Sequence, residues 1–174
     1  MHVLEKFRYC PVCGSSSFEE QDDKSKRCKR CSFEYYLNPS AAVAAFVLNS
    51  KGQLLTLRRR KAPARGTLDL PGGFADIGET IDEALMREVK EETGLTVTEF
   101  EFFTTLPNRY EYSGFVVPTL DSFFICKVSN ETELQANDDA EEALWLDLEE
   151  VHTEEFGLRS IRHALSSFLQ KYRK

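Results

Sequence analysis

The sequence predicts a small metal-binding head followed by a larger domain of the α/β class. Two closely spaced pairs of cysteines lie within the first 31 residues. Beyond residue 39, the chain has several apolar runs typical of strands and two segments of helical periodicity, at about 80–93 and 158–172. The composition is 41% hydrophobic and 29% charged, which is typical of a globular protein with a packed core. We therefore expect a head over residues 1–38 and an α/β domain over 39–174.

The charge balance argues against one broad class of function. The chain has 22 Lys plus Arg and 29 Asp plus Glu, a net charge of −7, whereas a non-specific nucleic-acid binder needs a basic surface. A local metal site can still bind an anionic nucleotide on an acidic protein. No apolar run approaches the roughly 18 residues of a membrane helix. The first residues also lack the apolar stretch of a signal peptide, so we expect a cytoplasmic protein without a membrane partner.

The head contains two C-x2-C pairs separated by 14 residues, Cys10 with Cys13 and Cys28 with Cys31. This pattern predicts a zinc ribbon whose four thiolates leave no position open, so the Zn²⁺ would be structural. Residues 8–36 hold few apolar side chains, and metal binding should therefore supply the folding energy. A disulfide pair is the first alternative, although it is rare in the cytoplasm. The second is nucleic-acid contact through basic residues, namely Lys24, Lys26, Arg27, Lys29 and Arg30.

The α/β domain begins with a predicted hairpin. Residues 41–48 are a continuous apolar run, which indicates a strand buried on both faces. Residues 49–52 have the composition of a turn, and 53–57 form the second strand. A loop marked by Pro63 and Gly66 follows.

The second half of the domain predicts strands at 95–106 and 115–128, joined by a loop. Cys126 lies in the second of these strands and is expected to be a buried, small apolar residue. A short strand is expected around Trp145. A final amphipathic helix is expected over about 158–172.

A helix over about 80–93 turns carboxylates toward its buried face. Thr80 and Glu83 form a capping box, and Gly94 occupies the position of a C-terminal cap. At about 100° per residue, one arc of this helix collects four apolar side chains, Ile81, Ala84, Leu85 and Val89. Glu88 and Glu92 fall within the same arc.

Glu91 lies at the border of that arc, so three carboxylates gather at one end of the helix. Partly buried carboxylates are costly without a cation, and neighbouring ones raise each other's pKa. A divalent cation removes both problems, and oxygen ligands at i, i+3 and i+4 suit Mg²⁺ or Mn²⁺. The alternative is a solvated acidic face, because Glu is a good helix former.

The residues around this helix resemble the Nudix box. Gly73, then five residues to Glu79, then seven to the run from Arg87 to Leu95, match it at every specified position. The box covers 23 residues with nine constrained positions. The resemblance covers residues 41–172. It implies an α/β/α sandwich around a mixed sheet and a metal-dependent pyrophosphohydrolase.

The resemblance also implies a role for each matching residue. Three carboxylates would bind Mg²⁺ or Mn²⁺, those of Glu88, Glu91 and Glu92. The backbone carbonyl of Gly73 would be a further ligand. Arg87 and Glu79 would pair with each other and orient the helix.

The implied reaction is attack by an activated water on one phosphorus of a nucleoside diphosphate derivative, such as NADH, NAD or ADP-ribose. The general base stays open. The candidates are Glu88 in the box and three acidic residues ahead of Trp145, namely Asp139, Glu141 and Glu142. Those three could equally belong to a solvated acidic loop.

Substrate contacts are less well defined. Arg58 or Arg60 would face inward by strand alternation and meet phosphates, or the basic run could be an exposed strand end. Arg109 and Tyr112, with Tyr110, are expected in a loop at the substrate mouth. An aromatic ring there could stack on a base or simply pack against the protein.

A zinc ribbon joined to a Nudix domain resembles the NADH pyrophosphatase branch. Its Ser-Gln-Pro-Trp-type signature is absent, and residues 107–112 stand in its place, so ADP-ribose or a similar compound is as plausible a substrate. The competing interpretation is a nucleotide-sensing regulator whose ribbon contacts a partner or nucleic acid. The intact box favours the enzyme. A homodimer is a further hypothesis, by analogy with related enzymes.

Overall fold

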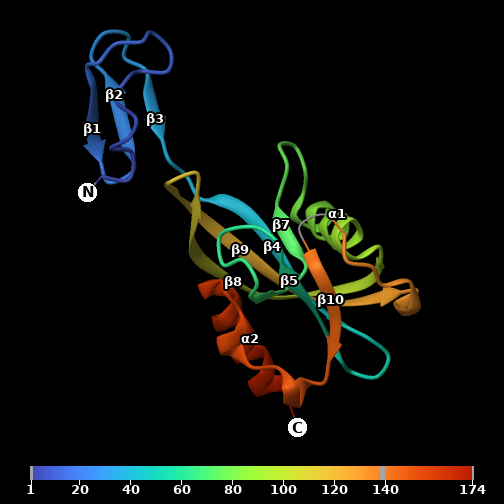
Figure 1. The fold of residues 1–174 in the computed structure, drawn as a ribbon. Coiled ribbons are helices and arrows are strands. Elements are labelled where there is room, and N and C mark those ends of the chain that lie inside the picture. The colour runs from blue at the N-terminus through green and yellow to red at the C-terminus, as the bar shows by residue number, and fades with distance from the viewer. Residues whose placement is uncertain (1, 138–139, 174) are drawn as a thin grey trace. The chain divides into compact units, whose positions relative to one another are not determined.

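The computed structural model describes residues 2–137 and 140–173. The chain divides into two compact units, Met1–Pro39 and Ser40–Lys174 (Figure 1). Each unit has its own sheet and its own buried core.

The first unit is a three-stranded antiparallel sheet. Its strands are β1 (Phe18–Asp22), β2 (Ser25–Cys28) and β3 (Glu34–Tyr36), in that order. The core of this unit is small, with Cys10, Phe18 and Cys28 buried at its centre. A core of this size fits the expectation that a metal ion contributes to folding.

The second unit is built on a seven-stranded mixed sheet. The strand order is β10-β5-β4-β9-β8, with β6 beside β5 and β7 beside β4. Strands β4 and β9 are parallel, and the other pairs are antiparallel. The strands are β4 (Ser40–Leu48), β5 (Leu54–Arg59), β6 (Leu68–Asp69), β7 (Gly72–Phe74), β8 (Thr96–Tyr112), β9 (Phe115–Ser129) and β10 (Ala140–Leu146).

Two α-helices cover the sheet, α1 (Ile81–Thr93) and α2 (Arg159–Tyr172). Short 3-10 turns occur at Glu131–Glu133, Leu148–Glu150 and Thr153–Glu155. Within the described part of the chain, no helix is both long enough and apolar enough to cross a membrane.

The two helices pack on opposite faces of the sheet, and alternation along β4 shows why. Ala44 and Phe46 belong to the cluster that includes α2, whereas Val43, Ala45 and Val47 belong to the cluster that includes α1. A strand buried on both faces was expected here, and the predicted α/β/α arrangement is confirmed (Figure 1).

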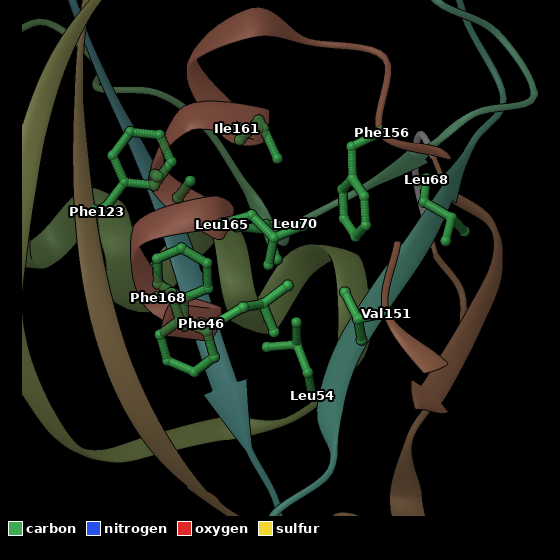
Figure 2. Close-up of a cluster of buried hydrophobic side chains, with 13 residues drawn as sticks. Phe46, Leu54, Leu68, Leu70, Phe123, Val151, Phe156, Ile161, Leu165 and Phe168 are labelled. Carbon is green, nitrogen blue, oxygen red and sulfur yellow. The ribbon is translucent and has the colours of Figure 1, made fainter. Parts of the chain in front are cut away.

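The core on the α2 side is rich in phenylalanine. Phe46 stacks on Phe168 with ring centroids 4.3 Å apart and planes 7° from parallel. Figure 2 shows Leu54, Val151 and Phe156 in the same cluster. This packing fixes α2 against the strands that form one wall of the site.

The predicted loop between the two long strands is wrong, because residues 107–112 continue β8. The antiparallel ladder runs to the Tyr112–Phe115 pair, and only Ser113 and Gly114 form the turn. Both have positive φ, 51° and 70°, as a two-residue hairpin turn requires. Pro107 is tolerated because β8 is an edge strand, where a missing N–H need not break a ladder bond.

Candidate functional site

Helix α1 has the caps and the inward face that the sequence predicts. The Thr80 hydroxyl accepts from the Glu83 N–H, the Glu83 carboxylate accepts from the Thr80 N–H, and Gly94 has φ 72°. Three residues of the apolar arc, Ala84, Leu85 and Val89, are buried, and Ile81 is partly buried. The Glu88 side chain is 15% exposed and Glu92 is half-buried, so the inward face becomes acidic at its end. The Glu91 side chain is 52% exposed and lies outside this face.

A glycine turn lies directly against the inward carboxylates. The Gly72 N–H donates to Glu92 Oε2 at 2.8 Å. A Cβ on Gly73 would lie 2.4 Å from Glu88 Oε1, and one on Gly72 would lie 2.1 Å from the Val43 carbonyl oxygen. Gly72 therefore needs glycine, because the backbone of β7 approaches that of β4 too closely for a side chain. At Gly73 a side chain would instead push the Glu88 carboxylate aside.

Arg87 lies among the acidic residues of the box. Its Nε and Nη2 donate to the two carboxylate oxygens of Glu79 at 2.8 and 2.9 Å, which confirms the predicted pair. Its Nη1 donates to Glu88 at 2.9 Å and to Glu91 at 3.1 Å. Nη2 also donates to the Phe74 carbonyl at 3.0 Å. The guanidinium thus ties the loop after β7 to α1 through bidentate, charge-assisted bonds.

The carboxyl groups of Glu79 and Glu88 have pKa values shifted in opposite directions by their surroundings. Hydrogen bonds from Arg87 lower the pKa of Glu79 to about 2. Burial raises the pKa of Glu88 above its usual range, even though Arg87 opposes the shift. Glu79 is therefore a firmly ionised anchor, whereas Glu88 is a carboxylate that a further cation would stabilise.

This donor set fits a divalent cation. Glu88 and Glu92 meet a backbone turn that has no side chains, and hard carboxylate and carbonyl oxygens suit Mg²⁺ or Mn²⁺. Within residues 2–137 and 140–173, however, the cysteines are the one set of three or more candidate ligands within 4.8 Å of one another. Metal binding by Glu88, Glu91, Glu92 and the Gly73 carbonyl therefore stays a prediction.

A cleft of about 340 Å³ opens beside the glycine turn. Part of its wall is formed by Gly72, Gly73, Glu88 and Glu92, and we call this part the acidic end of the cleft. Its walls also include apolar side chains from β4 and from the start of α2. The cleft therefore combines a charged region with an apolar one, as small-molecule sites commonly do.

The basic residues at the end of β5 are arranged differently from the expectation. Arg58 lines the cleft, and its Nε donates to Glu142 at 3.2 Å. Arg60 lies beyond the end of β5, is exposed, and is not part of the cleft wall. The inward orientation considered for Arg60 is therefore wrong. Arg59 lines the cleft instead and is paired with Asp69.

The predicted substrate contacts of Arg109 and Tyr112 are not supported. Both are exposed residues of β8 and lie outside the cleft wall. Asn108 and Tyr110 line the cleft, because alternation in the strand turns their side chains to the opposite face from Arg109. The Tyr110 ring meets the ring of Phe74 edge-on at 5.5 Å.

The candidates for general base differ in whether they line the cleft. Glu88 lines the cleft. Glu141 and Glu142 are exposed, and Glu142 is held by Arg58. Asp139 lies outside the described residues. The identity of the base stays a prediction.

Two buried carboxylates of the cleft wall were missed from the sequence. Burial raises the pKa of Asp69, and the charge of Arg59 opposes that shift. Asp121 accepts hydrogen bonds from the hydroxyl groups of Thr119, on the same strand, and Ser160, in α2. The sequence did offer a sign of both residues, because each is an Asp within a mainly apolar segment, and Asp is rarely buried without a partner.

The four cysteines of the head are assembled as a metal site. All four sulfurs lie within 4.8 Å of one another. The Cys10 and Cys31 sulfurs are 3.7 Å apart and those of Cys13 and Cys28 are 3.6 Å apart, and all are free thiols. The disulfide alternative is therefore wrong. The arrangement suits a tetrahedral ion held by four thiolates.

Two other residues singled out by type are structural. Lys26 is buried, and its Nζ donates to the Phe7 carbonyl at 2.8 Å and lies over the Phe18 ring. It therefore does not belong to a free basic surface for nucleic acid. Cys126 is buried, as expected, and burial raises its pKa to about 12.

Comparison with known proteins agrees with these features. The family model described as NUDIX domain matches residues 38–166. An ADP-ribose pyrophosphatase from Methanocaldococcus jannaschii is 38% identical over 118 residues, which are 67% of this chain and 66% of that protein. An NAD-capped RNA hydrolase NudC from Haemophilus influenzae is 29% identical over 118 residues, 66% of this chain and 44% of that protein. The chain thus spans less than two thirds of either relative.

The fold is also found among solved structures. The crystal structure of a NUDIX hydrolase from Nitrosomonas europaea has a TM-score of 0.74 and 20% sequence identity. The match covers 95% of this chain and 92% of that one. At this level of identity, the likeness concerns the fold alone.

Proposed function

Because the chain belongs to the Nudix family, we propose that it hydrolyses the pyrophosphate bond of a nucleoside diphosphate derivative in the presence of Mg²⁺ or Mn²⁺. The observation that carries this proposal is the contact of the Gly72–Gly73 turn with Glu88 and Glu92 at the acidic end of the cleft. The names of the relatives support ADP-ribose or an NAD-type compound as the substrate class.

Four groups would hold the divalent cation, the carboxylates of Glu88, Glu91 and Glu92 and the carbonyl of Gly73. When bound, such an ion supplies Lewis-acid polarisation of phosphate oxygens and an activated water. In the reaction, a bond forms between the water oxygen and phosphorus, the bridging P–O bond breaks, and the departing phosphate takes a proton. The pyrophosphate is thereby split into two phosphorylated products.

The contribution of the protein is mainly positioning. Arg87 fixes the loop after β7 to α1 by binding Glu79 and the Phe74 carbonyl. The glycine turn and the carboxylates of α1 therefore keep one fixed relation, which preorganised charge stabilisation requires. At the rim, Arg58 is held by Glu142 and offers a cation to substrate phosphate.

We also propose that the head binds one Zn²⁺ through its four cysteines and that this ion is structural. The support is the closed set of four thiols, which leaves no position for substrate. A zinc-to-protein ratio of one, measured by elemental analysis of purified protein, is the expected result.

The test of the enzymatic proposal is a turnover assay with Mg²⁺ across NADH, ADP-ribose, diadenosine polyphosphates and nucleoside triphosphates. We expect cleavage of ADP-ribose or an NAD-type dinucleotide, with AMP as one product. The same assay in EDTA should show no product. Tight binding of one compound without turnover of any would overturn the proposal and favour a nucleotide-sensing regulator.

A further inference from the structure

A buried carboxylate stands in the part of the cleft wall formed by β9. Asp121 is 8% exposed and lines the cleft together with Thr119. The Thr119 hydroxyl donates to Asp121 Oδ1 at 2.5 Å, and the Ser160 hydroxyl, from the start of α2, donates to Asp121 Oδ2 at 2.5 Å. The carboxylate is thus held at both oxygens and cannot swing away from the cleft.

In the cleft wall, Asp121 and Thr119 offer only lone pairs to a ligand. A hydroxyl group has one hydrogen to donate, and both hydroxyls spend theirs on Asp121. Among residues 2–137 and 140–173, no Lys, Arg or His lies within ion-pair distance of this carboxylate. The nearby Asp69 differs, because Arg59 neutralises it. A buried carboxylate without a paired cation is stabilised by each additional hydrogen-bond donor.

The sheet register places Asp121 within reach of a ligand bound at the glycine turn. Ala42 of β4 pairs with Phe74 on one side and with Asp121 on the other. Asp121 therefore lies two strands from the end of the glycine turn, roughly 10 Å across the sheet. Ala42 and Ala44 of β4 lie between β7 and β9, and both line the cleft, as does Ile161 of α2.

We infer that Asp121 is a specificity-determining residue that accepts a hydrogen bond from an N–H or O–H of the organic group attached to the pyrophosphate. The inference rests on the proposed function, because it takes the diphosphate to lie at the acidic end of the cleft. Two sources carry this chemistry in an adenosine diphosphate derivative. They are the exocyclic amino group of the base and a hydroxyl group of the adenosine ribose.

A purely structural role for Asp121 makes a different prediction. Helix α2 begins after Leu158, which gives no side-chain cap, and the bond from Ser160 brings a negative charge to this end of the helix. If that were the whole role, replacing Asp121 would lower the melting temperature and leave the relative preference for substrates unchanged.

The experiment compares kcat/KM for ADP-ribose with three analogues in Mg²⁺. One has hydrogen in place of the 6-amino group, and the others lack the 2′- or the 3′-hydroxyl of the adenosine ribose. We expect the wild type to discriminate against one of them by about 10- to 100-fold, because that analogue leaves the carboxylate without its donor. In Asp121→Ala the discrimination should fall to about one, and in Asp121→Asn it should be clearly reduced. The analogue that is rejected identifies the source.

Ser160→Ala is the matched control, because it removes one hydroxyl donor and keeps the carboxylate. It should retain the discrimination while losing some stability of α2. Equal handling of all analogues by the wild type would overturn the inference, as would an unchanged preference in both Asp121 variants.

Equilibrium binding of the same compounds in EDTA, measured by calorimetry, separates this inference from the proposed function. Loss of turnover with a retained, Asp121-dependent binding preference would reject the enzymatic proposal alone. Turnover in which no preference depends on Asp121 would reject the inference alone.

Discussion

The two candidate metal sites of the molecule are built in opposite ways. In the head, four thiols lie within 4.8 Å of one another. In the α/β domain, two carboxylates of α1, those of Glu88 and Glu91, accept from Arg87, and the third, that of Glu92, accepts from the Gly72 N–H. The four thiols alone can surround a metal ion. Two of the carboxylates, by contrast, are hydrogen-bonded to the guanidinium of Arg87, which belongs to the same helix.

The two ligand arrangements suit different roles, one structural and one catalytic. A closed set of thiolates binds tightly and contributes to folding, because the head has only a small core of its own. An open set of carboxylates leaves positions for water and substrate phosphate, which a catalytic ion needs. We therefore expect slow loss of zinc from the head and ready exchange of Mg²⁺ in the cleft.

The largest effect that tests this contrast is expected from Cys28→Ser. Removing one thiolate should abolish stoichiometric zinc binding and unfold the head, since structural zinc supplies on the order of 10 kcal/mol in small domains. Zinc content and limited proteolysis of residues 1–39 are the measurements. Cys126→Ser is the matched control, because Cys126 is buried in β9 and should leave zinc content unchanged. A full complement of zinc in Cys28→Ser would disprove the ribbon.

The next largest effect is expected from Glu92→Gln. The change removes a charge that meets the Gly72 N–H and leaves the volume of the side chain nearly the same. Turnover should fall by about 1,000-fold, since metal-derived charge stabilisation contributes several kcal/mol. The melting temperature should change little. Asp82→Asn, an exposed acid on the same helix, should keep full activity. Normal turnover by Glu92→Gln would refute its role in metal binding.

A smaller effect is expected from Arg87→Lys. Lysine keeps the charge but cannot make the bidentate contact with Glu79 or reach all four partners of the guanidinium. We expect a 10- to 100-fold loss in kcat/KM and a weaker apparent affinity for Mg²⁺, as for other outer-shell partners of metal ligands. Combined with Glu79→Gln, the losses should be less than additive, because the two residues act as one unit. Additive losses would show that they act independently.

The smallest effect concerns pH. The pKa of Glu79 is lowered to about 2 by Arg87, below its ordinary value near 4.5. The folded state therefore binds this proton less readily than the unfolded state. The resulting stability is present above about pH 4.5 and is lost as the pH falls toward 2. Denaturant unfolding of the wild type should show this loss, and Glu79→Gln should show a flatter profile in that window. Identical profiles would argue against the ion pair in solution.

The features predicted correctly from the sequence are those set by local rules. The limits of α1 follow from Thr80, Glu83 and Gly94, which act within one turn of the helix. The inward position of Glu88 follows from helical periodicity alone. The cysteine cluster follows from short spacings that a metal ion imposes.

The errors arise where a single residue of register or a distant partner decides the outcome. Arg59 lines the cleft and Arg60 does not, because β5 continues beyond the predicted strand as far as Arg59, which pairs with Asp69 of the neighbouring β6. The continuation of β8 through Pro107 was not predicted, because a proline argues against a strand unless that strand lies at the edge of a sheet. Asp121 is stabilised in part by Ser160, 39 residues away, and only the fold brings them together.

The two glycines at the ends of the box serve different needs. Gly94 has open surroundings, since an added Cβ would lie 3.6 Å from its nearest neighbour, the Glu133 carbonyl oxygen, but it requires left-handed backbone. An asparagine could meet that demand at modest cost. At Gly73 the limit is space, because even a methyl group would occupy the position of the Glu88 carboxylate. Gly73→Ala should therefore displace the Glu88 carboxylate without unfolding the helix that carries it.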